Sequence, residues 1–133
     1  MKILVLSLMR GGDIILTSPT VQKLREENPQ AEIHILINKQ FTKFSALVSG
    51  IDKTYCFDRD RAQQSLGSAD TPLFDSYDHL NELVDELNKE EYDLVLNLTQ
   101  NRFSGWVNSL IKSKESRGMV LEASNKASFG SAW

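Results

Sequence analysis

The sequence is poor in cysteine: Cys56 is the only one in 133 residues. A single cysteine excludes an internal disulfide and any zinc site built from several cysteines. No apolar run approaches the ~20 residues that a membrane helix needs, and Arg10 interrupts the first one too early for a signal peptide. With 15 basic against 18 acidic side chains, the chain also lacks the positive charge typical of nucleic-acid binders. We therefore expect a cytoplasmic protein that binds no nucleic acid.

What the sequence does contain is a regular alternation of strand and helix patterns. Apolar, strand-like runs lie at Lys2–Leu8, Glu32–Ile37, Lys53–Phe57 and Asp93–Leu98, with a weaker fifth at Arg117–Leu121. Helical patterns lie between them, at Ile14–Asn28, Lys39–Val48, Leu73–Leu87 and Ser104–Lys112. This order is typical of an α/β domain, a parallel sheet with helices on both faces. Right-handed crossovers then predict the Rossmann-like strand order 3-2-1-4-5.

The helical segments carry more specific predictions. Pro19 interrupts the first pattern, so we expect an irregular or kinked first half. The sequence Asp70-Thr71-Pro72 suits a helix cap with proline at the first helical position. The helix that follows should bury one face, made of Leu73, Tyr77, Leu80, Val84 and Leu87. The last helix should bury Trp106, Val107, Leu110 and Ile111. Residues 122–133 show no assignable pattern.

Charge is distributed unevenly along the chain. Residues 75–93 hold eight acids and one base, so the remainder carries ten acids and 14 bases. The acidic run is read as the solvated face of its helix. His34 and His79 lie on separate elements, and no metal pair is expected from them.

The junction after the first strand, Arg10-Gly11-Gly12-Asp13, is the strongest candidate site. Two glycines permit a tight turn and a close approach by a ligand or another backbone. The segment is neither G-x-G-x-x-G nor a Walker loop, which argues against generic dinucleotide or nucleoside-triphosphate binding. It places the carboxylate of Asp13 at a helix start, on the edge where open α/β sheets bind ligands. Asp13 is therefore either a helix cap or a reacting group, and the two roles can coexist.

Four arginines follow the ends of predicted strands: Arg10, Arg59, Arg61 and Arg102. If they converge on the ligand-binding edge, they suit a phosphate or carboxylate ligand. The polar loop that contains Asn101 has a position that suits ligand contact as well.

The chain also resembles a known family. Its Gly12-Asp13-Ile14, Ser18-Pro19 and Pro29-Gln30-Ala31-Glu32-Ile33 segments are similar to the start of glycosyltransferase family 9, the ADP-heptose:lipopolysaccharide heptosyltransferases. Segments 101–104 and 114–118 are similar too, so the resemblance covers nearly the whole chain and is most specific over the first 37 residues. Arg10-Gly11 departs from the commoner residues before the Gly-Asp pair, a change that bears on acceptor contacts.

The resemblance implies a GT-B enzyme of two Rossmann-like domains that inverts the anomeric centre and needs no metal or other cofactor. The N-terminal domain would hold a lipid-linked sugar acceptor, and the C-terminal domain a nucleotide-sugar, ADP-heptose in this family. Asp13 corresponds to the family's catalytic base. Arg59, Arg61 and Arg102 correspond to basic residues that hold acceptor phosphates or carboxylates. Together with Arg10, Gly11, Gly12 and Asn101, they make up the expected acceptor site.

Family members are more than twice as long as this chain. We therefore expect residues 1–133 to be an incomplete acceptor-side domain of a bacterial lipopolysaccharide-core glycosyltransferase, inactive without its donor half. Any membrane contact would be peripheral, through the basic edge. The alternative is a non-catalytic Rossmann-like module that binds an anionic ligand or a partner chain.

Overall fold

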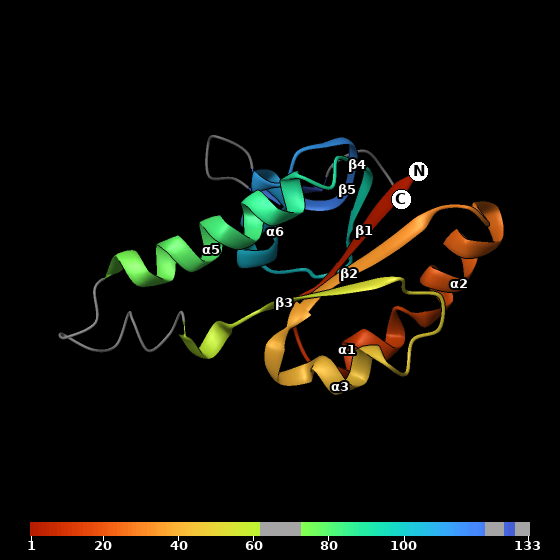
Figure 1. Cartoon of the computed structure of the whole chain (residues 1–133), viewed down its shortest axis with the longest axis horizontal. Helices are drawn as coiled ribbons and strands as arrows, with labels where there is room; N and C mark the ends of the chain where they lie inside the picture. The colour runs from red at the N-terminus through yellow and green to blue at the C-terminus, as the bar shows by residue number, and fades with distance from the viewer. Residues whose placement is uncertain (62–72, 122–126, 130–133) are drawn as a thin grey trace.

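The computed structural model describes residues 1–61, 73–121 and 127–129 (Figure 1). The strands are β1 (Lys2–Ser7), β2 (Glu32–Asn38), β3 (Lys53–Phe57), β4 (Tyr92–Asn97), β5 (Ser113–Leu121) and β6 (Ala127–Phe129). The helices are α1 (Gly11–Leu16), α2 (Ser18–Glu27), α3 (Thr42–Ser45), α5 (Leu73–Asn88) and α6 (Arg102–Leu110), and a 3-10 turn, η1 (Lys39–Phe41), precedes α3.

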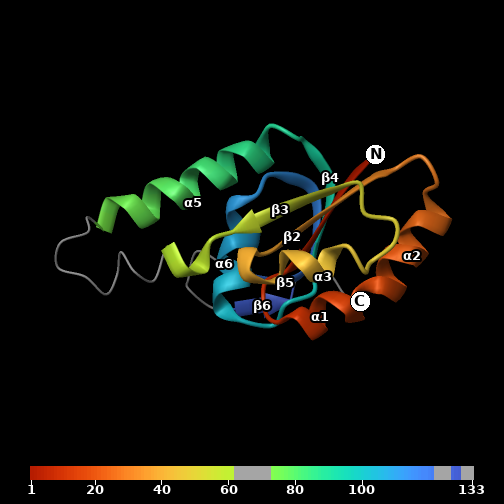
Figure 2. The same cartoon turned by 60° about the horizontal axis from the view of Figure 1, so that its bottom comes forward.

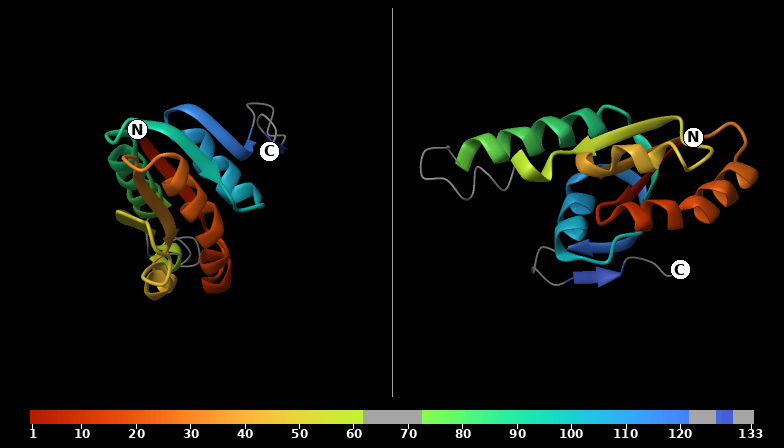
Figure 3. Two further views of the ribbon diagram at one scale, coloured as in Figure 1. Left: turned by 90° about the vertical axis from the view of Figure 1, so that its right-hand side faces the viewer. Right: turned by 90° about the horizontal axis from the view of Figure 1, so that it is seen from below.

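The predicted sheet is confirmed. The strands lie in the order β3-β2-β1-β4-β5-β6, and the first five pair in parallel. β1 is central, and Ile3 to Leu6 are completely buried. Such burial on both faces explains why the strand reads as an unbroken apolar run. Figure 3 shows β3 and β6 at opposite edges of the sheet.

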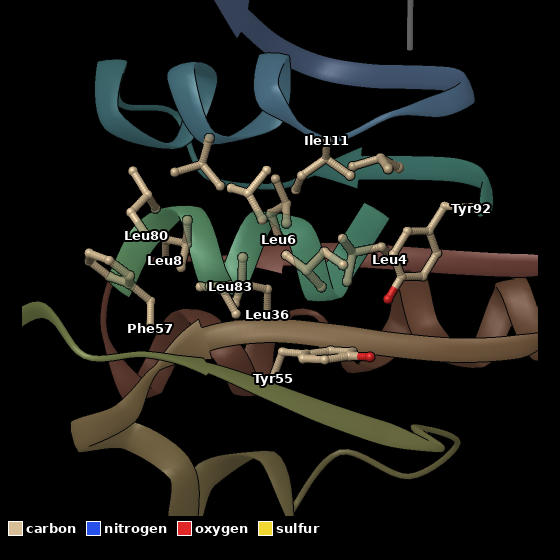
Figure 4. Close-up of a cluster of buried hydrophobic side chains, with 14 residues drawn as sticks. Leu4, Leu6, Leu8, Leu36, Tyr55, Phe57, Leu80, Leu83, Tyr92 and Ile111 are labelled. Atoms are coloured by element: carbon tan, nitrogen blue, oxygen red, sulfur yellow. The ribbon is translucent and has the colours of Figure 1, made fainter. Parts of the chain in front are cut away.

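Helices cover both faces of the sheet, also as predicted. Figures 1 and 2 show α5 on one side of the strands and α1 and α3 on the other. Leu4 and Leu6 pack beneath α5 and α6 in one core cluster (Figure 4). Ile3 and Val5, which point the opposite way along β1, belong to the second cluster, with α1 and α2.

The helix expected over Ile14–Asn28 is two helices. α1 begins earlier, at Gly11, and ends at Leu16; α2 begins at Ser18. The predicted interruption near Pro19 is therefore correct, and proline occupies the first turn of α2, where its missing N–H is not needed. The segment expected as one helix from Lys39 to Val48 is only the 3-10 turn and the four residues of α3.

Three residues predicted to be buried are not. Tyr77 is 59% exposed, and Trp106 and Leu110 are 37% exposed each. The rest of the predicted faces is buried: Leu80, Val84, Leu87, Val107 and Ile111. The burial of Leu73 and the cap at residues 70–72 lie outside the side chains that the structure describes.

The orientation of α6 has a polar cause. Ser104 and Asn108 face inward. The hydroxyl of Ser104 donates a hydrogen bond to the carbonyl of Thr99 (2.8 Å), and the side-chain amide of Asn108 donates one to the carbonyl of Met119 (3.0 Å). Buried polar groups with such partners cost little. The helix is thereby turned so that the apolar side chains of Trp106 and Leu110 lie outward.

The C-terminal part also differs from the prediction. β5 begins at Ser113 rather than Arg117, and β6, within the segment that showed no pattern, pairs with it in antiparallel fashion. The first half of β5 is polar and largely exposed, so it lacks the apolar signal that identifies buried strands.

A cluster of charged side chains connects neighbouring segments at the edge of the sheet where the parallel strands begin. Glu90, in the turn before β4, accepts hydrogen bonds from Lys2 (2.6 Å), Tyr55 (2.5 Å) and Lys53 (3.0 Å). These donors lower the pKa of Glu90 from 4.5 to about 2. The cluster therefore joins three segments: the start of β1, the strand β3, and the turn between α5 and β4.

This cluster predicts a specific dependence of stability on pH. Because the pKa of Glu90 is lower in the folded chain, its contribution is complete above about pH 4.5 and is lost as the pH falls toward 2. Glu90→Gln should lower the free energy of unfolding at pH 7 by roughly 1–3 kcal/mol. Urea denaturation at a series of pH values measures the difference, which should shrink below pH 4.5. Glu86→Gln, at an exposed position of α5, is the control, and an equal loss in both variants would contradict the assignment.

Candidate functional site

Asp13 closes the first turn of α1 with its own carboxylate. Its Oδ2 accepts the backbone N–H of Arg10 at 3.1 Å, and the N–H of Ile14 donates to the Arg10 carbonyl at 3.3 Å. The capping role considered from the sequence is therefore real. Within the described part of the chain, no hydrogen bond reaches the second oxygen, Oδ1. The carboxylate is held by one oxygen and retains the other for a ligand.

Asp13 lines a cavity of about 260 Å³. The lining comes from the end of β1, the α1–α2 corner and the end of β4: Ser7, Met9, Asp13, Leu16, Thr17, Thr20, Leu98 and Thr99. β1 and β4 are neighbours in the sheet, but the chain passes from β1 to β2 on one side and from β4 to β5 on the other. This is the topological switch point, where open α/β sheets form their ligand crevice. Besides Asp13, the lining has four hydroxyl-bearing residues, and the apolar side chains of Met9, Leu16 and Leu98 form much of its surface.

The backbone that leaves β1 toward Asp13 is fixed from both neighbouring strands. From β4, the Oγ1 of Thr99 accepts the N–H of Leu8 at 2.8 Å. From β2, the amide of Asn38 donates to the carbonyls of Leu8 and Met9, both at 3.0 Å. Thr99 and Asn38 are 3% and 2% exposed. The sequence analysis missed Asn38, whose signal is an amide directly after the apolar run Ile35–Ile37.

The two glycines of the junction have different roles. A Cβ on Gly11 would lie 2.6 Å from the ring of Phe44, so this glycine allows α3 to pack against α1. A Cβ on Gly12 would meet nothing within 4 Å, and Gly12 is exposed. The close neighbour at Gly11 is thus a side chain, whereas the sequence analysis expected a ligand or another backbone.

A second and larger cavity, of about 380 Å³, lies at the ends of β2 and β3. It is lined by Asn38, Lys39, Gln40, Asp58, Arg59, Asp60 and Arg61. The structure therefore brings the predicted Arg59 and Arg61 together and adds Lys39, which the sequence analysis did not select.

The charge of this second cavity is predominantly basic. The ammonium of Lys39 lies 2.7 Å from Asp58, and the N–H of Arg61 donates to the same carboxylate at 3.1 Å. The pKa of Asp58 is lowered, mainly by the hydrogen bond from Lys39 and next by the backbone N–H of Arg61, so this carboxylate stays ionised and paired. Three cationic side chains and two carboxylates thus line the cavity, and because Lys39 and Asp58 pair with each other, Arg59 and Arg61 remain against Asp60.

The remaining predicted residues line neither cavity. Arg10 is exposed beside the start of α1. Asn101 is a helix cap, because its Oδ1 accepts the N–H of Ser104 at 2.7 Å, and Arg102 is the first residue of α6. Their positions after β1 and β4 are as predicted, but they do not join the lining of Asp13 or that of Arg59.

Among the described residues, one group has the geometry to offer metal ligands: Glu32, His34 and Glu90. It lies where the strands begin, at the edge opposite both cavities. Its atoms already have protein partners, since His34 contacts Glu32 and Tyr92 at 2.8 Å each and Glu90 is paired with Lys2. No helix in the described ranges is both long and apolar enough to cross a membrane.

Comparison with solved structures identifies similar folds. The chain superposes on a family 9 glycosyl transferase from Veillonella parvula with a TM-score of 0.71 and 26% identity, over 90% of this chain and 32% of that one. The heptosyltransferase WaaC of E. coli, solved with ADP and with ADP-2-deoxy-2-fluoro heptose, gives TM-scores of 0.71 and 0.72 at 15% identity. Each WaaC match covers 88% of this chain and 36% of the other.

The resemblance to glycosyltransferase family 9 seen in the sequence therefore extends to the three-dimensional fold. The chain spans about a third of the length of these structures. Neither the family models nor the curated proteins give a match to it.

The hydrogen bond to Thr99 predicts a measurable loss of stability. Thr99→Val preserves the shape of the side chain but leaves the buried N–H of Leu8 without its acceptor, which costs about 1–3 kcal/mol. Urea denaturation measures the loss. Thr20→Val is the matched control, since Thr20 lines the same cavity but is only partly buried. Equal stability of the Thr99→Val variant and the unmodified chain would show that the bond does not hold the junction.

Proposed function

We propose that this chain is the acceptor-side domain of an inverting glycosyltransferase. The enzyme would transfer heptose, or a related sugar, from a nucleotide-sugar to a lipopolysaccharide core acceptor. The observation that carries the proposal is the half-buried carboxylate of Asp13, which lines a cavity at the switch point of the sheet. The fold that holds it is the one shared with the family 9 glycosyl transferase.

Asp13 would act as the general base. Its Oδ2 is held by the N–H of Arg10, and Oδ1 would take the proton from the acceptor hydroxyl. The hydroxyl oxygen then forms a bond to the anomeric carbon while the bond from that carbon to the nucleotide diphosphate breaks. The diphosphate leaves with the bonding electrons. Attack on the face opposite the leaving group inverts the anomeric centre.

The larger cavity would anchor the acceptor. Arg59, Arg61 and Lys39 provide cationic groups that suit phosphates or carboxylates on the saccharide. Asn38 contributes to this cavity and also donates to the carbonyls of Leu8 and Met9 beside the Asp13 cavity. An anionic group anchored after β3 would thus orient the reacting hydroxyl after β1, which is how positioning lowers a barrier. The donor would be bound by a second domain, and the same basic edge would face an anionic membrane on its cytoplasmic side.

Asp13→Asn tests the catalytic role in the enzyme that contains this domain together with its donor domain. The amide oxygen can still accept the Arg10 N–H, so the first turn of α1 should persist while the base is lost. Turnover should fall by roughly 10²- to 10⁴-fold, with acceptor binding retained. Glu27→Gln, at an exposed position of α2, is the control. Near-normal turnover of the Asp13→Asn enzyme would leave Asp13 as a helix cap only.

Acceptor binding can be measured on the 133-residue chain itself by calorimetric titration. We expect it to bind a phosphorylated lipid A–core saccharide and not an ADP-sugar. Replacing Arg59 and Arg61 together by alanine should weaken acceptor binding at least tenfold, because each charge-assisted pair contributes roughly 1.5–3 kcal/mol when formed. Lys23→Ala, on the exposed side of α2, should leave the affinity unchanged.

Binding of the nucleotide-sugar alone would mean that the domain holds the donor. Acceptor binding together with full turnover of the Asp13→Asn enzyme would instead indicate a binding module.

A further inference from the structure

An apolar stripe runs along the outer side of α6. Phe103, Trp106 and Leu110 are spaced by three and four residues, so they lie on one side of the helix. They are 36%, 37% and 37% exposed, although the opposite side of α6 is buried through Ser104, Val107 and Asn108. Aromatic side chains that remain this exposed at helical spacing are typical of interaction surfaces.

The stripe is held in place by its neighbours. The ring centroid of Phe103 lies 5.1 Å from the ring centroid of Phe57, a core residue. It lies 6.2 Å from the ring centroid of Trp106. At the other end, Asn88 of α5 donates to the carbonyl of Leu110 (3.3 Å) and accepts the N–H of Lys112 (2.7 Å). A partner would therefore meet side chains that are already ordered, which reduces the entropic cost of binding.

The border of the stripe on α5 is acidic. Asn88 contacts the end of α6, so the side of α5 that carries Asn88 faces that helix. Asp85 lies one turn before Asn88, and Asp78 lies two turns further along the same side. Both are exposed, as are Glu82 and Glu86 on the outer surface of α5. Tyr77, 59% exposed, lies about three turns before Asn88 on the same side of α5.

We propose that the stripe and this acidic border form a docking surface for a basic amphipathic helix of a partner protein. Leucine-type side chains of the partner would contact Phe103, Trp106 and Leu110, and flanking lysines or arginines would pair with Asp85 and Asp78. The stripe spans the eight residues from Phe103 to Leu110, about 10 Å along the helix axis, which matches about two turns of a partner helix. The charge disfavours an anionic membrane and a second copy of the same acidic face. The surface uses none of the cavity residues and does not depend on the proposed transferase activity.

The probe is a synthetic helical peptide of about four turns, built from leucine and lysine, with its leucines on one face. Calorimetric titration into the 133-residue chain should detect binding that weakens with added salt, whereas the same peptide with glutamate in place of lysine should not bind. Trp106→Ser and, separately, Asp85→Lys should each weaken binding at least tenfold. Leu47→Ser is the matched control, because Leu47 is 65% exposed and lies just after α3 on the opposite layer.

Leu110→Ser is a second variant of the stripe, and far-UV circular dichroism of every variant must match that of the unmodified chain. Absence of peptide binding, or binding that Trp106→Ser and Leu110→Ser leave unchanged, would overturn the proposal. Binding of phosphatidylglycerol vesicles that Trp106→Ser abolishes would identify a lipid surface instead. A dimer in sedimentation that Trp106→Ser dissociates would identify a second copy as the occupant.

Discussion

The position of the candidate site depends on how the backbone leaves β1. That strand is buried on both faces, and its chain must turn out of the sheet between β2 and β4. Asn38 and Thr99, one from each neighbour, pair with the three backbone groups of Leu8 and Met9 that the turn would otherwise leave unsatisfied. Unpaired backbone groups at a buried strand end are costly, so these three hydrogen bonds favour a single backbone conformation for the turn after β1. That conformation determines where Asp13, four residues after Met9, is placed.

The two edges of the sheet divide stability from function. Where the parallel strands begin, the carboxylate of Glu90 is already bound by three donors of the protein itself. Where the strands end, the side chains of Arg59 and Asp13 line open cavities. A parallel sheet favours this division, because every crossover brings the chain back to the beginning edge and all the loops that follow strands collect at the other.

Much of this arrangement can be predicted from the sequence, and the exceptions have physical causes. The buried strands could be found because burial on both faces demands continuous apolar runs, as at Ile3 to Leu6. The sequence suggested that α6 buries its most apolar side, but hydrogen bonds from Ser104 and Asn108 to distant carbonyls turn that helix. Such pairings join elements far apart in sequence, and periodicity does not report them. Asn101 likewise lies after β4 as predicted, yet its side chain caps α6.

The observed capping contact of Asp13 is compatible with the catalytic role that we propose for it. A carboxylate has two oxygens, and the cap uses only Oδ2. A free aspartate in a loop would sample several rotamers, and fixing one of them for reaction costs side-chain entropy. Here the hydrogen bond from Arg10, made within the first turn of α1, keeps the carboxylate oriented before any ligand arrives. The reactivity that we propose for Oδ1 would therefore depend on the same local contact that starts the helix, and a helix start at the carboxyl ends of the strands would provide an oriented acceptor for a proton.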